Sequence, residues 1–315
     1  MTIARFDRRY RLKLDPLRRR LQEAINSVDP QLLITHPVES YVQRLDLYEK
    51  QQGYHFVPAE IGRQCEMIGA KSGLRTLEFY HKLLLVSLIE SYDERQKRCR
   101  IPHSIKQIIP PEFDRILTAM EQAEDGFYLH GNDLFAKDLG LCRLKLLPCG
   151  SEVVDLWSGI PRSTLLRGNV SQLVWVAMFL SRLGGFKPFY ESHWDRRLVR
   201  RFTAKEYDLC YVRIADLLRL NPDVKGMFGS SWWFDPQLKD IAPELLFLRR
   251  TPVENGARIF QLGPDAGAIR DAVQFSKKRK ALYESGKFTP CRYMLVWARA
   301  DMLTWADRFV ISENR

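Results

Sequence analysis

The 315-residue chain lacks most of the short motifs that identify common binding sites. It contains no GxxxxGK[ST] and no GxGxxG sequence, so neither a P-loop nor a dinucleotide-binding loop is predicted. The GxSxG sequence of a serine hydrolase is also missing, because no second glycine follows Gly229-Ser230-Ser231. These absences exclude the nucleotide-binding and hydrolase classes that depend on such loops.

Cysteines and histidines do not occur at the spacings of a metal site. There is no CxxC pair, and no histidine lies three or four residues from another. His193 and Asp195 have the spacing of two ligands of a facial iron triad, but no histidine follows them to supply the third. We therefore expect no metal and reduced thiols, mostly in the core, at six scattered positions: Cys65, Cys99, Cys142, Cys149, Cys210 and Cys291.

No apolar run is long enough for a bilayer span, since the longest, residues 173–180, is followed by Ser181 and Arg182. The basic N-terminus is not followed by the apolar block of a secretory signal, so we expect a cytoplasmic protein. Acidic residues are outnumbered, with 49 Lys and Arg against 38 Asp and Glu, a net charge of +11. Such a charge favours nucleic acid, anionic lipid, acidic proteins or phosphate-bearing ligands without choosing among them.

Residues 1–125 are predicted to be helical. Asp15 and Pro16 form a helix start signal, with Asp as the cap and Pro in the first turn. His81 lies in a long apolar stretch, where a core histidine is expected rather than a ligand. The predicted helices begin after Pro16 and cover approximately 38–50, 59–70, 74–100 and 112–125.

Residues 126–315 are predicted to form an α/β domain, because β-like runs alternate with helical ones. Thr203 and Glu206 form a capping box that opens a helix reaching Leu220. The expected architecture is a helical N-terminal region followed by a mixed β-sheet flanked by helices. The predicted strands are 141–148, 151–157, 186–194, 224–234, 244–250, 257–262 and 291–298, and the other helices 170–183 and 269–285.

The stretch 151–194 is the best candidate site, with a loop that enters the helix of residues 170–183. The N-terminus of a helix offers unpaired backbone N–H groups and a partial positive charge to a phosphate. Gly168 lets the backbone approach a ligand closely, and Arg162 and Arg167 are placed to pair with phosphate oxygens. An alternative is that this loop only caps the helix.

This order of strand, Arg-Gly loop, helix, strand and helix resembles the acyl-CoA-binding core of GNAT-type N-acyltransferases, over residues 127–220. The segment Asn132–Gly140 looks like the entry segment of autoinducer-synthase-like members, which use acyl carrier protein or acyl-CoA as donors. The resemblance implies that Arg162, Arg167, Gly168, Asn169 and Val170 bind the cofactor's pyrophosphate. It also implies that strand 186–194 splays from its neighbour, near Trp157 and Phe189, to admit the acyl-pantetheine arm. The family's second small residue in the loop is replaced here by bulkier ones.

Acyl transfer to an amine needs a base and a group that assists the leaving thiolate. Glu191 and His193 alternate with Tyr190 on one predicted strand, so the first two share a face and are candidate bases. Tyr190 is a candidate donor to the thiolate. We therefore predict an N-acyltransferase acting on an amine of a small molecule or peptide, with acyl carrier protein as a possible partner. The alternative is a non-catalytic basic protein that binds nucleic acid or an acidic protein.

Overall fold

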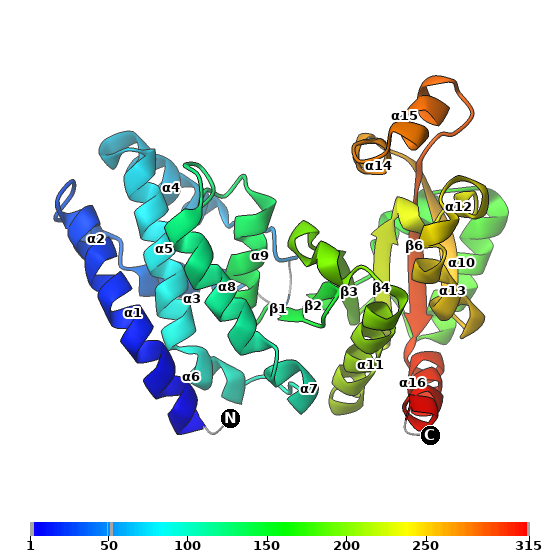
Figure 1. Ribbon diagram of the computed structural model, residues 1–315, viewed down its shortest axis with the longest axis horizontal. Helices are drawn as coiled ribbons and strands as arrows, with labels where there is room; N and C mark the ends of the chain where they lie inside the picture. Colours follow the sequence, from blue (N-terminus) through cyan, green and yellow to red (C-terminus); the bar gives the residue numbers. More distant parts are fainter. Residues whose placement is uncertain (1–2, 49, 51–52, 314–315) are drawn as a thin grey trace. The chain divides into compact units, whose positions relative to one another are not determined.

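The chain folds into two compact units, Met1–Pro148 and Cys149–Arg315, in a computed structural model that describes residues 3–48, 50 and 53–313 (Figure 1). The sequence placed this boundary between residues 125 and 126. It falls later because α9 (Asp133–Cys142) packs against α5 (Leu74–Glu90), with Phe135 and Leu139 buried. The predicted strand at 141–148 is wrong at its start, since α9 continues to Cys142 and only β1 (Leu146–Pro148) is extended.

The first unit is a helical bundle built around α5. Most of α5 is buried, including the run Leu83–Val86, so the helix is covered on more than one side. The other helices of this unit are α1 (Ile3–Asn26), α2 (Leu32–Thr35), α3 (Val38–Asp46), α4 (Ala59–Ser72), α6 (Tyr92–Lys97), α7 (His103–Lys106) and α8 (Ile109–Gln122). The predicted helical character of this region is confirmed.

The predicted helix start at Asp15-Pro16 is wrong, because α1 begins at Ile3 and Pro16 lies inside it. A proline inside a helix costs roughly 3 kcal/mol. Four buried side chains on one stripe, Tyr10, Leu14, Leu21 and Ile25, offset this cost as α1 packs against α5. Tertiary burial thus overrides the local signal.

The sheet is mixed and six-stranded, in the order β1-β2-β3-β4-β6-β5. Its further strands are β2 (Glu152–Ser158), β3 (Phe189–Trp194), β4 (Gly226–Ser231), β5 (Arg258–Pro264) and β6 (Cys291–Ala298). β3 and β4 are parallel, whereas the pairs β2–β3, β4–β6 and β5–β6 are antiparallel. The predicted mixed α/β character is confirmed.

Helices and short 3-10 turns connect the strands. They are η1 (Arg162–Leu166), α10 (Val170–Arg182), η2 (Arg196–Arg201), α11 (Ala204–Leu220), η3 (Trp232–Phe234), α12 (Leu238–Ile241), η4 (Pro243–Leu245), α13 (Phe247–Glu254), α14 (Ala266–Val273), α15 (Lys277–Glu284) and α16 (Arg299–Glu313). The predicted strand 244–250 is wrong, because η4 and α13 occupy it. A short apolar run does not distinguish a strand from a buried helix. The predicted helix 269–285 is two helices, α14 and α15.

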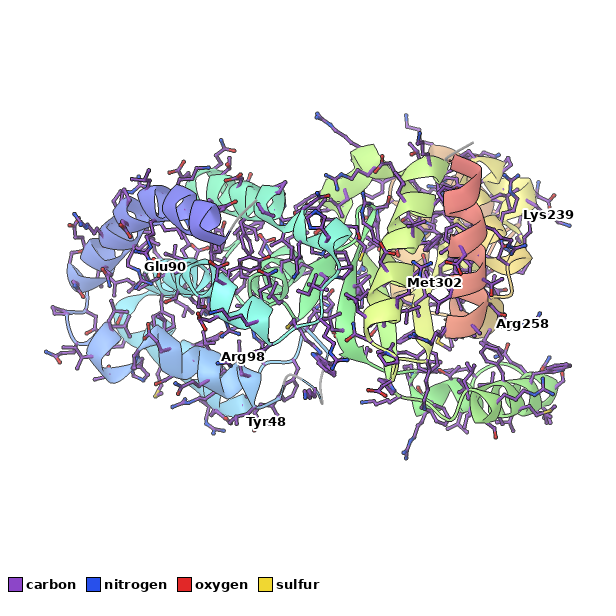
Figure 2. The ribbon with its side chains drawn as sticks, turned by 90° about the horizontal axis from the view of Figure 1, so that it is seen from below. Tyr48, Glu90, Arg98, Lys239, Arg258 and Met302 are labelled. Atoms are coloured by element: carbon purple, nitrogen blue, oxygen red, sulfur yellow. The ribbon has the colours of Figure 1, made fainter. Side chains whose placement is uncertain are left out.

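Helices cover both faces of the sheet. On one face, Val176 and Leu180 of α10 pack with Phe189, Phe228 and Phe260. On the other, Tyr211 of α11 contacts Trp297 of β6, and α16 lies beside α11 with Met302 fully buried (Figure 2). Alternate residues of each strand therefore face different helices.

Candidate functional site

Glu191 and His193, the predicted bases, lie together on the α10 face of β3. His193 Nε2 is 3.7 Å from Glu191 Oε2, and both side chains are about one quarter exposed. Ser158 Oγ donates to Glu191 Oε2 at 2.6 Å, which orients the carboxylate. Ser158 follows a bulge in β2, between Asp155 and Ser158. Bulges of this kind re-aim side chains and are frequent next to active sites.

Tyr190 does not join this pair, because it points to the opposite face of β3. Its side chain is buried, and its hydroxyl interacts with Asn221. Burial raises the pKa of Tyr190 above its usual value, so the phenol keeps its proton. The structure therefore gives Tyr190 a core position and removes it as a donor to a thiolate at the Glu191–His193 pair.

In the predicted phosphate loop, residues 162–170, the polar groups at the start of α10 are engaged within the chain, whereas Arg162 and Arg167 form no ion pair in the described part of the chain. Asn169 caps α10, where its Oδ1 accepts from Gln172 N at 2.9 Å. Gly168 has φ +77°, and the Gln172 side chain fills the space beside it, since an added Cβ would lie 2.5 Å from Nε2. Arg162, Arg167 and Val170 are exposed. Asn169 thus caps α10, and the Gln172 side chain occupies the space beside Gly168.

Gln172 also ties the start of α10 to the edge of the sheet. Its Oε1 accepts from Gln261 N and its Nε2 donates to Gln261 O, both at 2.8 Å. Gln261 pairs with Tyr293 of β6, and Tyr293 pairs with Ser231 at the end of β4. The start of α10 therefore lies at the edge of the sheet where β4 has its carboxyl end. It contacts β5, which is three strands away from β3, or about 14 Å.

The slot expected near Trp157 and Phe189 is closed. β2 and β3 are antiparallel and pair from Glu152↔Trp194 to Ser158↔Phe189 across the bulge. The pairing of β2 with β3 was not predicted, because strand order is not encoded in local pattern.

The pairing of β3 with β4 is shorter than the two strands themselves. Their parallel pairing ends at Ser192↔Gly229. Beyond that point β3 stays paired with β2 as far as Trp194, and β4 stays paired with β6 as far as Ser231. Open α/β sheets bind ligands at the carboxyl ends of such parallel strands.

A loop rich in arginine follows β3 at this edge. Asp195 caps η2 and forms a bidentate ion pair with Arg197, with contacts of 2.5 to 3.1 Å. In the part of the chain that the structure describes, Arg196, Arg200 and Arg201 form no ion pair. The loop ends at the N-terminus of α11, where Thr203 Oγ1 accepts from Glu206 N as the capping box predicts. Helix N-terminus and arginines together favour an anion.

A buried acid that sequence reasoning missed lies under this edge, on the α11 face. Glu152 of β2 interacts with the hydroxyls of Ser192 and Tyr207. Burial raises the pKa of Glu152 from 4.5 to about 7, and these hydroxyls oppose that rise. The rings of Trp194, Phe202 and Trp233 pack edge to face beside it, with centroids 5.0 to 6.3 Å apart. The signal available in the sequence was the pair of acids, Glu152 and Asp155, in an otherwise apolar strand.

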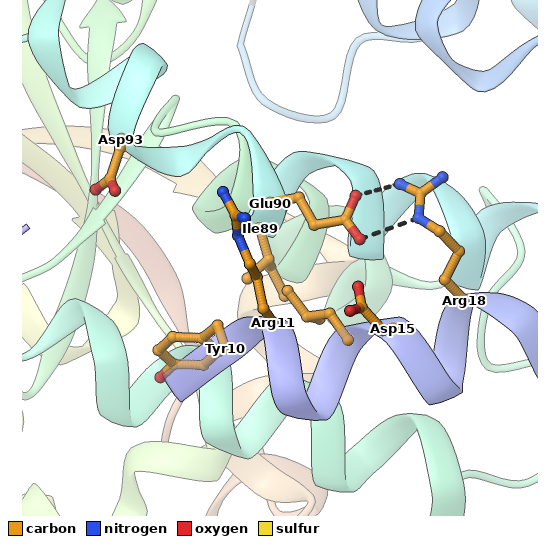
Figure 3. Close-up of a pocket in the computed structure, with 8 residues that line it drawn as sticks. Tyr10, Arg11, Asp15, Arg18, Ile89, Glu90 and Asp93 are labelled. Carbon is orange, nitrogen blue, oxygen red and sulfur yellow. Dashed lines mark hydrogen bonds and ion pairs between the residues drawn. The ribbon is translucent and has the colours of Figure 1, made fainter. Parts of the chain in front are cut away.

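The first unit has a cavity of about 370 Å³ along α1 (Figure 3). Arg18 and Glu90 form an ion pair at its side, with Nε 3.0 Å from Oε1. Because its lining has neither a thiol nor an imidazole, we assign no chemistry to it. The lining residues are Tyr10, Arg11, Leu14, Asp15, Arg18, Ile89, Glu90 and Asp93.

The first unit also contains a cluster of one cysteine and two histidines in its interior. The ligating atoms of Cys65, His81 and His130 lie within 4.8 Å of one another. Burial lowers the pKa of His81 to about 3 and that of His130 to about 4, so both imidazoles are neutral near pH 7. His81 is thus a core histidine, as expected, but with a thiol and a second imidazole beside it.

No protein-family model, curated protein or solved structure matches the chain. Among the described residues, no helix combines the length and apolar character that crossing a membrane requires.

Proposed function

We propose that the second unit is an N-acyltransferase that moves an acyl group from acyl-CoA or acyl carrier protein to an amine of a small molecule or peptide. The observation that carries the proposal is the end of the β3–β4 pairing at Ser192↔Gly229, followed by the arginine-rich η2. In the GNAT-type enzymes that the sequence resembles, a strand parts from its neighbour to admit the pantetheine arm. Here β3 and β4 would fill those roles.

In this proposal the donor's phosphates bind at η2 and the start of α11. Arg196, Arg200 and Arg201 supply positive charge, and Asp195 engages Arg197 and thereby fixes the turn. The amides at the N-terminus of the 17-residue α11 add a favourable dipole. The site proposed for phosphate therefore moves from Arg167-Gly168 to the loop after β3.

The transfer requires little side-chain chemistry. The amine attacks the thioester carbonyl carbon, the C–S bond breaks, and the thiolate leaves with the electron pair. His193, held against Glu191, takes the proton that the amine loses. Ser158 keeps the carboxylate in place. The thiolate then takes a proton from His193, so the base returns to its starting form.

The test is calorimetry of the full chain with acyl-CoA and with an acyl carrier protein, together with thiol release in the presence of amines. Acyl-pantetheine, which lacks the nucleotide phosphates, is the matched control ligand. We expect acyl-CoA to bind at least tenfold more tightly than acyl-pantetheine, and thiol to appear only with an amine present. Failure of both donors to bind would remove the proposal.

A second candidate is a non-catalytic protein that binds nucleic acid or an acidic protein. Its support is α15, where Lys277, Lys278 and Lys280 are exposed and Phe275 is 74% exposed just before the helix. Binding through these charges would weaken steeply as salt rises. Retention on nucleic acid that does not change between low and high salt would count against it.

A further inference from the structure

We propose that Cys65, His81 and His130 of the first unit bind one thiophilic transition-metal ion, zinc(II) or copper(I). The three residues come from α4, α5 and the segment that precedes α9. Their ligating atoms lie within 4.8 Å of one another, with Cys65 and His81 buried and His130 half-buried. This site is separate from the acyl-transfer site of the second unit and does not depend on it.

The separation of the donor atoms fits a metal centre. Cys65 Sγ lies 3.6 Å from His81 Nε2. Around tetrahedral zinc, Zn–S and Zn–N bonds of about 2.3 and 2.0 Å place a sulfur and a nitrogen about 3.5 Å apart. An outer limit of 4.8 Å for the remaining pairs leaves at most about 1.5 Å to close, within the reach of side-chain rotations.

The tautomer of His81 is fixed in the form that a metal needs. His81 Nδ1 lies 2.6 Å from the carbonyl oxygen of Tyr128. A carbonyl only accepts, so Nδ1 carries the hydrogen and Nε2 presents its lone pair toward Cys65. Metal-bound histidines usually donate their other N–H to a carbonyl or carboxylate in this way.

Tyr41 contacts two of the three proposed ligand residues. Its hydroxyl hydrogen-bonds to His130 Nε2 and interacts with the Cys65 thiol. The Phe135 ring lies over both imidazoles, at 5.0 Å from His81 and 5.7 Å from His130. A bound ion would therefore replace the contact of the Tyr41 hydroxyl with the Cys65 thiol, and would take His130 either through Nδ1 or through Nε2 in place of Tyr41.

Thiolate and imidazole together select zinc and copper(I) over magnesium or calcium. On binding, the metal–sulfur bond replaces the S–H bond, and the thiol proton leaves to solvent. Copper(I) with one thiolate and two neutral imidazoles has no net charge, whereas zinc(II) retains one positive charge unless the Tyr41 hydroxyl also ionises. Each ion therefore releases the one thiol proton, and zinc(II) releases a second only where the Tyr41 hydroxyl also ionises.

The first experiment measures metal content and thermal unfolding of the full chain. We expect close to one equivalent of zinc or copper in the isolated protein, and a rise in Tm when zinc or anaerobic copper(I) is added to the chelator-treated chain. Cobalt(II) in place of zinc should give a thiolate charge-transfer absorption. A folded wild-type chain that shows no Tm rise with either ion and no cobalt absorption would overturn the proposal.

The matched variants are Cys65→Ser and Cys142→Ser, since both cysteines are buried in the first unit and free of disulfides. Cys65→Ser should lose the cobalt absorption and at least tenfold in affinity, while Cys142→Ser retains both. His130→Gln provides a second ligand variant in case Cys65→Ser does not fold. Equal binding by wild type, His130→Gln and Cys65→Ser would place the metal elsewhere, on surface histidines, and overturn the assignment.

Discussion

Two loops of the second unit lead from a strand into a long helix, and they differ in what their polar groups contact. The loop before α10 contains Gly168 and an Asn cap, and Gln172 occupies its centre. The loop before α11 has no glycine, yet it holds three arginines without an ion pair in the described part of the chain. It also follows a strand whose pairing with its parallel partner ends at Ser192↔Gly229.

The difference favours the loop before α11 as the proposed anion site, because it carries more arginines and follows the end of the β3–β4 pairing, although it has no glycine. At the loop before α10, the backbone N–H of Gln172 donates to Asn169 Oδ1, and the side-chain Nε2 of Gln172 donates to the carbonyl oxygen of Gln261. A phosphate at that loop would have to displace these bonds, each worth about 1 kcal/mol. Arg196, Arg200 and Arg201 at the second loop have no ion pair to give up in the described part of the chain, and the same holds for Arg162 and Arg167 at the first, so the second loop offers three such arginines against two.

The largest expected effect is on turnover. His193→Gln and Glu191→Gln should each lower the rate of thiol release by about 100-fold or more, because general base catalysis typically contributes that much. Donor affinity by calorimetry should stay within about twofold. If Tyr190→Phe caused the same loss of turnover as His193→Gln, the assignment of the chemistry to the α10 face would be wrong.

Substitution of the arginines in each loop tests the comparison of the two loops most directly. The triple change Arg196→Ala, Arg200→Ala and Arg201→Ala should weaken acyl-CoA binding about a hundredfold, since charge-assisted contacts to phosphate are lost. The matched double change Arg162→Ala and Arg167→Ala should leave it within about twofold. The reverse result would return the phosphate site to the loop before α10.

Glu152 predicts a pH dependence of stability. In the unfolded chain this carboxyl titrates near 4.5, and in the folded chain at about 7. Between these values the folded chain holds a proton that the unfolded chain has lost, so the free energy of unfolding falls as pH rises through this window. The total fall is about 3 kcal/mol, and it persists above pH 7. Denaturant unfolding at pH 5 and pH 8 measures it.

Glu152→Gln should remove most of this difference, because the amide does not ionise. Glu206→Gln on the surface of α11 provides a control that leaves the pH dependence in place. An unchanged slope in Glu152→Gln would mean that another group carries the effect.

The smallest expected effect concerns the loop before α10. Asn169→Ala removes the helix cap and should lower the free energy of unfolding by about 1 kcal/mol, with no change in donor affinity. Thermal unfolding and calorimetry on the same preparation separate the two readouts. Loss of donor affinity without loss of stability would make Asn169 a ligand-binding residue after all.

Local sequence patterns were sufficient to predict many of the helices and strands. The capping box of Thr203 and Glu206 predicted α11, which spans Ala204–Leu220, and the run of β-formers at 291–298 is β6. Apolar residues without a clear period were not sufficient, since the run at 244–250 forms η4 and α13. Period and capping report on backbone conformation, whereas a short apolar run reports only burial.

The candidate sites required more than local pattern. Alternation along residues 189–194 correctly placed Glu191 and His193 on one face and Tyr190 on the other, because side chains of a strand alternate. The distance between His81 and Cys65, and the approach of His130 to both, had no sequence signal. These residues come from separate helices and a connecting segment, so their spacing along the chain matches no metal motif.

The sequence by itself determined that a helical region precedes a region of alternating strands and helices, where α11 begins, which residues of β3 share a face, and that the chain is basic. The tertiary structure alone decided which strand pairs with β3, where that pairing ends, and which donors are already satisfied. The physical reason is that periodicity and capping are set by residues within one turn or one pleat. Strand order and buried polar contacts depend instead on how distant segments share a core.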